Sequence, residues 1–474
     1  MATKTDPKIE VTKYTHRFLA RFVIEAETPL AVGSGEKDII TDALVATDVN
    51  GLPYIPATAI AGVVRSMLGK DVTKEYFGYQ EKKTGKGSEV IFTEAKILNS
   101  KGSVIDGLDI KAKKDNTLLQ EYDELPVRQH VRIGHQGVTE NAGKFDEQVV
   151  FAGTRFCFEL EMVSDGSNVD VFEGILAQLK SKTFRIGGGT RCGFGKISVV
   201  SVKTRQLDLT NSTDLELYLS KSSNLAEAKS WSGWQDQTVE ADALSDGWTE
   251  YVLELKPDDF FFFGSGFGDN EVDMTPVKEK KVKWIDGVGE LSEELVLIPA
   301  TSVKGALSHR VAFHYNKLEV GDKKPVYAEN LSPNEFEKYV GKNNKAVVDL
   351  FGSEGEHKGD EDKGQVRGKL LFSDIIYKEL DDKILNHVSI DRFTGGAMDG
   401  ALFSEKTTYG KGKTFVMTIL ADNSAFETEG VKDALEKALK DICKGLLPLG
   451  GGVNRGNGIF SGSLRRDKEI IYAN

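Results

Sequence analysis

Two aspartates, Asp42 and Asp273, each follow a Gly-Ser-Gly stretch and precede an Ile-Pro-Ala-Thr tetrapeptide. An isolated carboxylate in such a loop can hold a divalent cation, or it can orient a hydroxyl group for attack on a neighbouring phosphorus atom. A loop aspartate more often only caps a turn, because its short side chain accepts hydrogen bonds from nearby backbone amides. The interpretation of both residues therefore depends on their sequence context.

That context is an internal repeat. The Gly-Ser-Gly stretches begin 231 residues apart, and the same offset takes Asp38 to Asp269 and Asp42 to Asp273. The tetrapeptides are 243 residues apart, so the second copy has 12 more residues between aspartate and tetrapeptide. Four further pairs follow in the same order: Tyr76-Phe77-Gly78 with Leu350-Phe351-Gly352, Ile91-Phe92-Thr93-Glu94 with Leu371-Phe372-Ser373-Asp374, His130-Val131 with His387-Val388, and Gly187-Gly188-Gly189 with Gly450-Gly451-Gly452. Six ordered matches predict a duplicated unit.

Each copy predicts the same elements around its aspartate. Strand-like runs at 18–26 and 250–256 lead into the Gly-Ser-Gly loops, and each tetrapeptide opens a helix, with Thr58 as the expected N-cap of the first. The remaining elements are expected as strands at 89–97, 149–163, 197–202, 367–377, 412–420 and 459–464, and as helices over 172–179 and 431–442. This order predicts an α+β protein of two tandem ferredoxin-like (RRM-like, βαββαβ) domains with insertions.

The repeat also predicts where the domains divide. A chain of 474 residues exceeds what one hydrophobic core usually serves. We place the first domain at 1–204 and the second at 248–474. Residues 205–247 have no repeat counterpart, so we expect a linker there, partly docked through Trp231 and Trp234.

Two glycine-rich loops, 186–195 and 449–458, contain Arg191 and Arg455. Glycines let backbone N–H groups approach a phosphate chain closely, and a guanidinium group beside them suits the same ligand. Both loops lack the Gly-Lys-Ser/Thr ending of a Walker A motif, which disfavours a nucleotide hydrolase. The alternative is a tight turn between elements.

A glycine-rich run at 386–415 carries Arg392, Phe393 and Met398, and its counterpart in the first copy carries Arg132 and His135. Apolar side chains among basic ones can wedge between bases or stack on them. The composition alone favours a β-hairpin packed on its own domain.

The bulk composition limits the function classes. The formal net charge of −12 disfavours nucleic-acid binding by bulk attraction, although affinity follows local phosphate neutralisation. Three widely spaced cysteines predict neither a disulfide framework nor a zinc site. No apolar run is long enough for a membrane span, and the N-terminus lacks the apolar region of a signal peptide, so we expect a cytoplasmic protein with no membrane partner. The motifs predict no small-molecule cofactor.

Taken together, the GSG loop, the PYIPAT helix start, the LFG and LFSD segments, HVSIDRFTGGAMDGALF and GGGVNRGNGIFSG resemble the RAMP superfamily, in particular backbone subunits of type III CRISPR effector complexes. The resemblance occurs twice and covers most of the chain, as in a fused double subunit. It implies a ferredoxin-like core along a CRISPR guide RNA, thumb hairpins that interrupt the duplex with target RNA, and other type III effector subunits as partners.

The resemblance also implies metal-dependent cutting of target RNA by an aspartate in the loop after the first strand. Asp42 lies at that position, and Asp273 occupies it in the second copy, with Asp269 as the weaker alternative. The same two aspartates would hold the divalent metal, Mg²⁺ or Mn²⁺. The residues predicted to bind RNA are Lys37, Thr58, Arg65, Arg132, His135, Arg185, Arg191, Thr301, Ser302, Lys304, Arg392, Phe393, Met398 and Arg455.

Two alternatives remain open at this point. One is a guide-precursor-processing endoribonuclease of the same superfamily, which would use a histidine such as His16, His130 or His387 as general base. The other is a structural RNA-binding subunit with silent aspartates. The copies also differ, since Ala61 stands where the second has Lys304, which predicts that the two units bind or cut differently.

Overall fold

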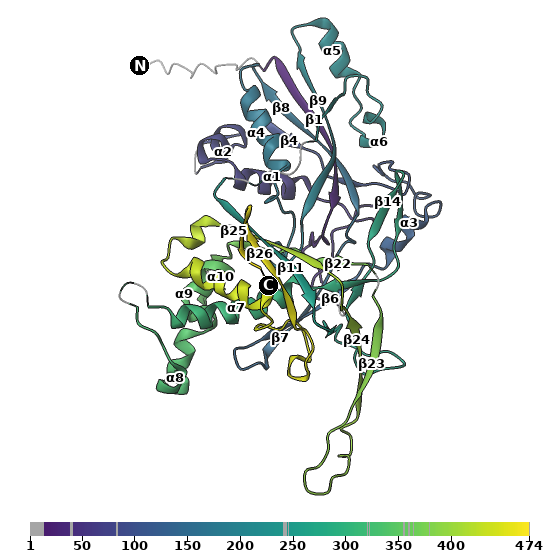
Figure 1. Cartoon of the computed structure of the whole chain (residues 1–474). Helices are drawn as coiled ribbons and strands as arrows, with labels where there is room; N and C mark the ends of the chain where they lie inside the picture. The colour runs from purple at the N-terminus through teal and green to yellow at the C-terminus, as the bar shows by residue number, and fades with distance from the viewer. Residues whose placement is uncertain are drawn as a thin grey trace.

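The computed structural model describes residues 14–37, 41–81, 84–239, 244, 246–319, 321, 323–353, 356–358, 361–363, 365–378 and 380–473. Asp38, which the repeat matches with Asp269, lies outside these residues. The described chain forms two stacked units, the first made by the N-terminal half and the second by the C-terminal half (Figure 1).

The first unit is built around β1 (His16–Ala26), which lies between β8 (Arg155–Ser164) and β9 (Ile197–Asp208) and is antiparallel to both. The edge next to β8 carries β4 (Val90–Phe92) and β5 (Lys96–Ile97), and β10 (Gln235–Gln237) extends the edge next to β9. Two helices, α1 (Ala57–Met67) and α4 (Val169–Leu179), share one core with β1. Side chains along a strand point to alternate faces of the sheet. Phe18 and Phe22 are four residues apart on β1, so both point to the face that carries this core.

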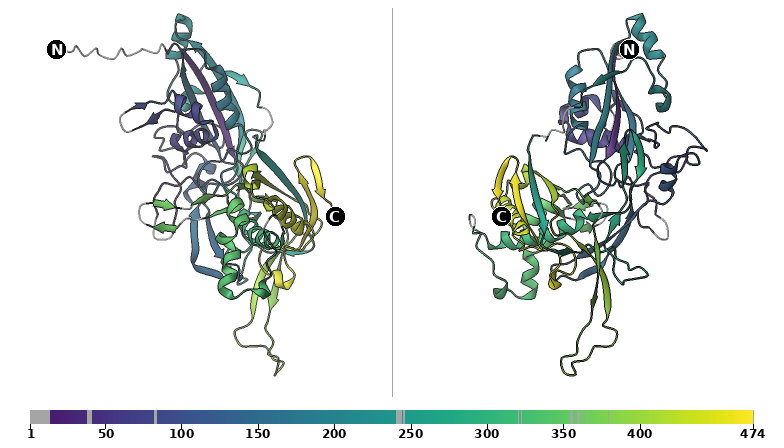
Figure 2. Two further views of the ribbon diagram at one scale, coloured as in Figure 1. Left: turned by 90° about the vertical axis from the view of Figure 1, so that its left-hand side faces the viewer. Right: turned by 45° about the vertical axis from the view of Figure 1, so that its right-hand side comes forward.

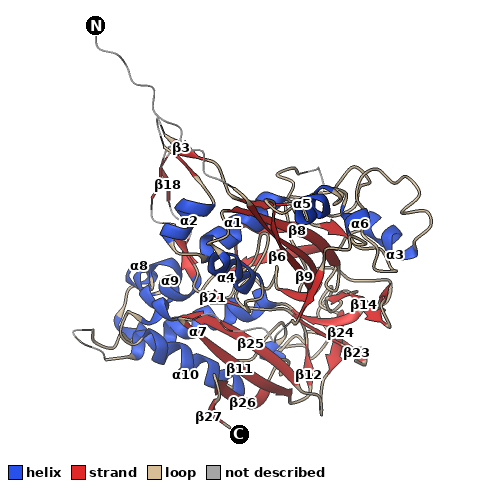
Figure 3. Ribbon diagram, turned by 90° about the horizontal axis from the view of Figure 1, so that it is seen from above, coloured by secondary structure: helices blue, strands red, loops and turns tan. Residues whose placement is uncertain are grey.

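The second unit repeats this plan. Its central strand β11 (Trp248–Pro257) lies between β25 (Phe415–Asp422) and β26 (Phe460–Arg466), with β21 (Leu370–Leu371) beyond β25 and β27 (Glu469–Tyr472) beyond β26. The core side is covered by α7 (Ala300–Lys317), α9 (Lys345–Phe351) and α10 (Val431–Cys443). In both units the chain runs strand, helix, strand, strand, helix, strand, and the two helices of this order, α1 and α4 or α7 and α10, lie on one face of the sheet (Figure 3).

The helix faces predicted from apolar spacing are confirmed. Phe172, Ile175, Leu176 and Leu179 are the buried residues of α4, and the apolar positions of α10 from Val431 to Ile442 are buried likewise. The predicted N-cap of α1 is wrong, because the helix begins at Ala57 and Pro56 occupies the N-cap, which leaves Thr58 inside the first turn. The predicted strand at 367–377 is also divided, since β21 pairs with β25 whereas β22 (Ile375–Tyr377) pairs with β16 (Leu295–Ile298) of a smaller sheet.

Shorter elements occupy the connections. They are α2 (Lys70–Tyr76), β2 (Tyr79–Gln80), β3 (Gly85–Lys86), α3 (Thr117–Gln120), η1 (Glu121–Asp123), β12 (Phe260–Phe261), β13 (Lys278–Glu279), η2 (Ala328–Asn330), α8 (Pro333–Phe336), η3 (Glu337–Tyr339), η4 (Gly341–Asn343), β17 (Gly352–Ser353), β18 (Glu356–Lys358), β19 (Glu361–Lys363), β20 (Val366–Arg367), η5 (Asn423–Phe426) and η6 (Val453–Arg455).

The segment expected as a linker packs on the first unit. After β9 it forms α5 (Ser212–Leu219) and α6 (Leu225–Ala228), then returns as β10 to the edge of the first sheet (Figure 1). Trp231 is buried against Leu19 and Leu207, and Trp234 meets the Trp231 ring edge-on with 5.0 Å between ring centroids. Since Leu19 follows Phe18 along β1, this cluster lies on the sheet face opposite the main core.

The 12 extra residues of the second copy form a hairpin of β14 (Val282–Ile285) and β15 (Val288–Leu291), which reaches onto the first unit (Figure 1). The Val282 backbone N–H donates to the Ala152 carbonyl at 2.8 Å, and the Trp284 indole N–H donates to the Gly153 carbonyl at 2.8 Å. The Arg155 guanidinium lies 4.2 Å from the Trp284 ring centroid. The insertion therefore fastens the second unit to the first.

A buried ion network completes this joint between the units. Arg128, on β6 (Val127–Ile133) of the first unit, donates to Glu279 Oε2 at 2.7 Å and to Asp374 Oδ2 at 2.5 Å in the second unit. The three side chains are 6%, 7% and 0% exposed. Asp374 also accepts a hydrogen bond from the Ala300 N–H at 2.8 Å, which satisfies one of the unpaired amides at the start of α7.

Candidate functional site

Each unit extends a β-hairpin from the place where its aspartate loop meets the body of the unit. The first hairpin is β6 with β7 (Thr139–Gln148), and the second is β23 (Asp382–His387) with β24 (Phe403–Tyr409). Ala43 forms a parallel bridge with Glu147, and Met274 forms the equivalent bridge with Glu405. Each aspartate therefore lies at the root of the hairpin of its own unit, and the two aspartates occupy equivalent positions relative to those hairpins.

Asp42 is exposed and is held by the first hairpin. Its backbone N–H donates to Asp146 Oδ1 at 2.9 Å, and Asp42 Oδ2 accepts from the Asp146 N–H at 3.1 Å. Gln129 donates to the other oxygen, Asp146 Oδ2, at 3.3 Å. Within the described part of the chain, the Asp42 carboxylate thus bonds to a strand 104 residues away and not to an amide of its own loop.

Asp273 is held in the same way by the second hairpin. Its Oδ2 accepts from the Ser404 backbone N–H at 2.8 Å and from the Ser404 hydroxyl at 3.1 Å. Asp269 differs, because its Oδ1 caps its own loop by accepting from the N–H groups of Glu271 and Val272. These backbone bonds, together with a hydrogen bond from Lys406, lower the pKa of Asp269 to about 2. Asp273 is therefore the structural counterpart of Asp42.

The two aspartate sites offer different ligands to a metal ion. The first combines the carboxylates of Asp42 and Asp146, which suits a Mg²⁺-type ion completed by phosphate oxygens and water. At the second, the residue that holds Asp273 is the neutral Ser404. Among the described residues, no three His, Cys, Asp or Glu side chains converge as a metal-binding group, so these residues alone do not supply a full ligand set at either place.

The hairpin tips also differ. The tip of the first hairpin rests on the second unit, where His135 Nε2 lies 3.5 Å from Glu337 Oε1 and its ring centroid lies 5.5 Å from that of Phe336. The second hairpin projects away from both units (Figures 1 and 2). Phe393 at its tip is 99% exposed, so this tip is not packed on its own unit as the composition had favoured.

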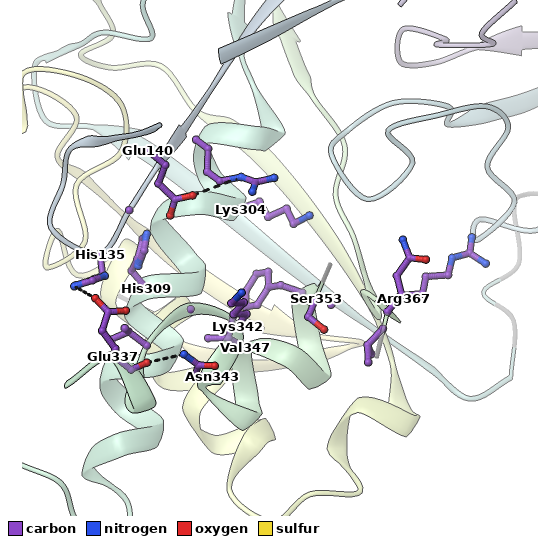
Figure 4. Close-up of a pocket in the computed structure, with 18 residues that line it drawn as sticks. His135, Glu140, Lys304, His309, Glu337, Lys342, Asn343, Val347, Ser353 and Arg367 are labelled. Atoms are coloured by element: carbon purple, nitrogen blue, oxygen red, sulfur yellow. Dashed lines mark hydrogen bonds and ion pairs between the residues drawn. The ribbon is translucent and has the colours of Figure 1, made fainter. Parts of the chain in front are cut away.

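A cavity of 840 Å³ lies between the first hairpin and helices α7 and α9 of the second unit (Figure 4). The basic side chains and histidines on its wall are Arg132, His135, Lys304, His309, Lys342 and Arg367. Its acidic side chains are Glu140, 3.9 Å from Arg132, and Glu337, beside His135. The wall therefore carries a local excess of positive charge on a chain whose net charge is negative.

The comparison with family models agrees with this division into two units. The model of the RAMP superfamily matches residues 23–198 and 255–461, which together cover most of the chain. The chain belongs to the RAMP superfamily. A search of curated proteins gives no match. Membership makes this a CRISPR-associated, RNA-binding type of protein with two RAMP units, and no helix within its described residues could cross a membrane.

The cavity brings together three predicted RNA-binding residues from the two RAMP units: Arg132 and His135 from the first and Lys304 from the second. His309, Lys342 and Arg367 were not predicted. His309 follows Lys304 by five residues on α7, and because this spacing does not place two side chains on one helical face, the helical pattern gave no signal for it. Lys342 and Arg367 lie near insertions whose course the repeat does not determine.

Several other predicted RNA-binding residues lie on exposed surfaces of the RAMP units. These are Lys37, Thr58 and Arg65 in the first, and Ser302, Arg392 and Met398 in the second, while Thr301 is half-buried at the start of α7. Arg65 donates to the Gly78 carbonyl at 3.3 Å.

Three predicted arginines have protein partners instead. Arg185 is buried and donates to Ser373 Oγ at 3.3 Å, and Arg191 donates to the Gly368 carbonyl at 2.8 Å across the joint. Burial, together with the nearby charge of Arg367, lowers the pKa of Arg191 to about 10. Arg455 forms an ion pair with the buried Glu405 at 2.5 Å. The glycine-rich loops around them pack closely on the backbone, since a Cβ atom at Gly187 would lie 2.7 Å from the Ala31 carbonyl oxygen and one at Gly450 would lie 2.3 Å from the Phe262 carbonyl oxygen.

Each RAMP unit also has a histidine–glutamate pair at the root of its hairpin. His130 Nε2 lies 3.0 Å from Glu147 Oε1, and His387 Nε2 lies 3.1 Å from Glu405 Oε1. Both rings stack on a phenylalanine of the opposite strand, Phe145 or Phe403, with 4.8 Å between centroids. The pairs fasten the two strands of each hairpin, on the face opposite the residues that hold the aspartates. His16 lies elsewhere, 4.0 Å from Asp208.

Proposed function

We propose that the chain is a fused double backbone subunit of a type III CRISPR effector complex, each half a ferredoxin-like domain that binds guide RNA, and that it cleaves complementary target RNA at its aspartate loops. The proposal rests on one observation above all: Asp42 and Asp273 are held at the root of a hairpin by equivalent backbone bonds. A carboxylate that caps a turn accepts hydrogen bonds from amides of its own loop. Asp42 and Asp273 are exposed and instead accept from a strand of the hairpin, at equivalent positions in both units.

The cavity at the joint supports guide-RNA binding. A protein that neutralises backbone phosphates releases condensed counterions, so a local basic surface gives salt-dependent affinity whatever the net charge. Arg132, Lys304, Lys342 and Arg367 provide such a surface between the units. Ferredoxin-like domains are supported by the sheet order, since the strand that follows the second helix, β9 or β26, pairs with the central strand of its unit.

The second hairpin supports contact with the guide–target duplex. Phe393, Met398 and Leu402 are exposed near its tip, beside Arg392. Apolar side chains presented this way stack on bases or insert between them. Such an insertion would splay a nucleotide of the target strand near the aspartate loop.

The cleavage needs few groups. The 2′-hydroxyl oxygen of a splayed nucleotide forms a bond to the adjacent phosphorus, its proton passes to a carboxylate or to water, the P–O5′ bond breaks, and water protonates the leaving oxygen. The products are a 2′,3′-cyclic phosphate and a 5′-hydroxyl end. Asp42 with Asp146 would hold a divalent cation such as Mg²⁺ or Mn²⁺, which when bound supplies positive charge to the phosphate.

The test uses the assembled complex with Asp42→Asn, Asp273→Asn and the double variant, with Asp433→Asn, at an exposed carboxylate on α10 away from both aspartate loops, as the control. Target cuts are mapped with Mg²⁺, with Mn²⁺ and with a chelator. We expect each single variant to lose its own cut by about 10²-fold or more and the control to keep both. A double variant that gives every wild-type cut would leave the structural RNA-binding subunit as the better description. Loss of guide maturation in a His16, His130 or His387 variant would favour the processing enzyme.

A further inference from the structure

The second aspartate site contains a cation of its own. Ser404 and Lys406 are two residues apart on β24, so their side chains share one face of the strand, about 7 Å apart along it. Ser404 holds Asp273. Lys406 Nζ lies 3.0 Å from Asp269 Oδ2 and 3.4 Å from Glu271 Oε2, on the loop that leads to Asp273.

The first site has no counterpart of this lysine. The matched bridges of Ala43 with Glu147 and of Met274 with Glu405 align the hairpins, and they place Gln148 at the position of Lys406 and Asp146 at that of Ser404. Gln148 accepts a hydrogen bond from the Val45 N–H at 3.1 Å. The first site thus has a carboxylate and an amide where the second has a hydroxyl and an ammonium.

The ammonium group lies between two carboxylates, as a bridging divalent cation would. A metal ion at that place would have to displace Lys406 or lie beside a positive charge, and both are unfavourable. An ammonium has three N–H donors, and two carboxylates leave one of them for a further acceptor. The hydrogen bond that Lys406 donates to Asp269 raises the pKa of Lys406, so the group stays charged near neutrality.

We propose that the second aspartate site works without a bound metal ion, and that Lys406 is its fixed cation, held by Asp269 and Glu271 so that it can donate to a phosphate oxygen of the RNA beside Asp273. This inference rests on the proposed function. The first site, with Asp42 and Asp146 and with Gln148 at the register position of Lys406, is the one that takes a divalent cation.

The reciprocal swap tests this. Lys406→Gln gives the second site the residue of the first, Gln148→Lys does the reverse, and Lys406→Arg keeps the charge as a control. In the assembled complex we expect the Asp273-dependent cut to persist in a chelator and the Asp42-dependent cut to disappear. Lys406→Gln should lower the metal-free cut by about 10²-fold, as when one charge-stabilising donor is removed. Gln148→Lys should weaken the metal requirement of the Asp42-dependent cut. Lys406→Arg should keep more of the metal-free cut than Lys406→Gln does, because it keeps the positive charge.

A second readout does not depend on cleavage. Mn²⁺ titrations of the purified chain, followed by electron paramagnetic resonance, count the bound ions. Lys406→Gln should gain Mn²⁺ binding that Glu271→Gln in the same chain removes. The inference is overturned if both cuts of the wild type need the same metal concentration, or if Lys406→Gln changes neither cutting nor Mn²⁺ binding. If neither aspartate affects any cut, the proposed function itself fails, and the titration still decides whether the second site excludes metal.

Discussion

The ion network at the joint permits a quantitative prediction for Arg128→Met. Methionine keeps much of the volume of the arginine side chain but removes its charge. Glu279 and Asp374, 7% and 0% exposed, would then be buried carboxylates without a cationic partner at this position. Removing one member of a buried ion pair costs about 3–5 kcal/mol, because the remaining charge is left unsolvated. In the wild type, burial by itself lowers the pKa of Arg128, but Asp374 and Glu279 outweigh it and raise the pKa above its ordinary value.

The assay is urea unfolding followed by tryptophan fluorescence, because Trp284 crosses the joint. With a slope of about 3 kcal/mol per molar urea, a loss of about 3–5 kcal/mol lowers the midpoint of the transition that includes the joint by roughly 1–2 M. The control is the triple variant Arg128→Met, Glu279→Gln, Asp374→Asn, in which the side-chain amide introduced by the last substitution can still accept from the Ala300 N–H. Neutralising the whole network is expected to recover most of the loss.

Two results would refute this reasoning. A midpoint unchanged in Arg128→Met would mean that the network does not hold the units together. A triple variant as unstable as the single one would mean that the loss comes from packing against Phe194, whose ring centroid lies 4.8 Å from the Arg128 guanidinium, and not from stranded charge.

Two further predictions concern exposed groups. Phe393→Ala should weaken target-RNA binding by the complex about 5- to 150-fold, the loss typical of one base–aromatic stack, without changing the unfolding midpoint. Phe313→Ala on α7 is the matched control. Equal RNA affinities for the two variants would contradict the stacking role. The pKa of Asp269, depressed to about 2, means that its hydrogen bonds stabilise the fold above pH 4 and are lost as the pH falls from about 4 to about 2. In Lys406→Gln a carboxyl titration by NMR should show a higher pKa for Asp269, still below its ordinary value because two backbone bonds remain; an unchanged pKa would show that Lys406 does not hold this carboxylate.

Sequence patterns predicted much of this fold, because the apolar spacing that marks a helix or a strand involves residues close together in the chain. The apolar spacing of α4 and α10 repeats within a few helical turns. The duplication also gives two sequences for each element, so each element could be predicted from both copies. The aspartate loops were found for the same reason, since Asp42 and Asp273 share one register. Predicting those features does not require knowing which residues far apart in the sequence come into contact.

The features that the sequence did not predict depend on distant pairs. Asp146 lies 104 residues from Asp42, and Asp374 lies 246 residues from Arg128. Arg185 and Arg191 illustrate the difficulty, because an arginine near glycines has the same local sequence whether it faces a phosphate or a polar group of the other unit. Only the contact between the two units distinguishes these two cases, and the repeat does not predict that contact.

The joint also explains why two similar units form an ordered pair. By the hairpin register Leu385 occupies the position of Arg128, and by the glycine-loop register Asn457 occupies that of Phe194. The counterpart of Asp374 is Glu94, which is 48% exposed and pairs with Lys96 at 2.6 Å in its own unit. The first unit also has the short loop 49–51 where the second has the β14–β15 hairpin. A head-to-tail contact between two copies of the chain would therefore lack both the ion network and the inserted tryptophan.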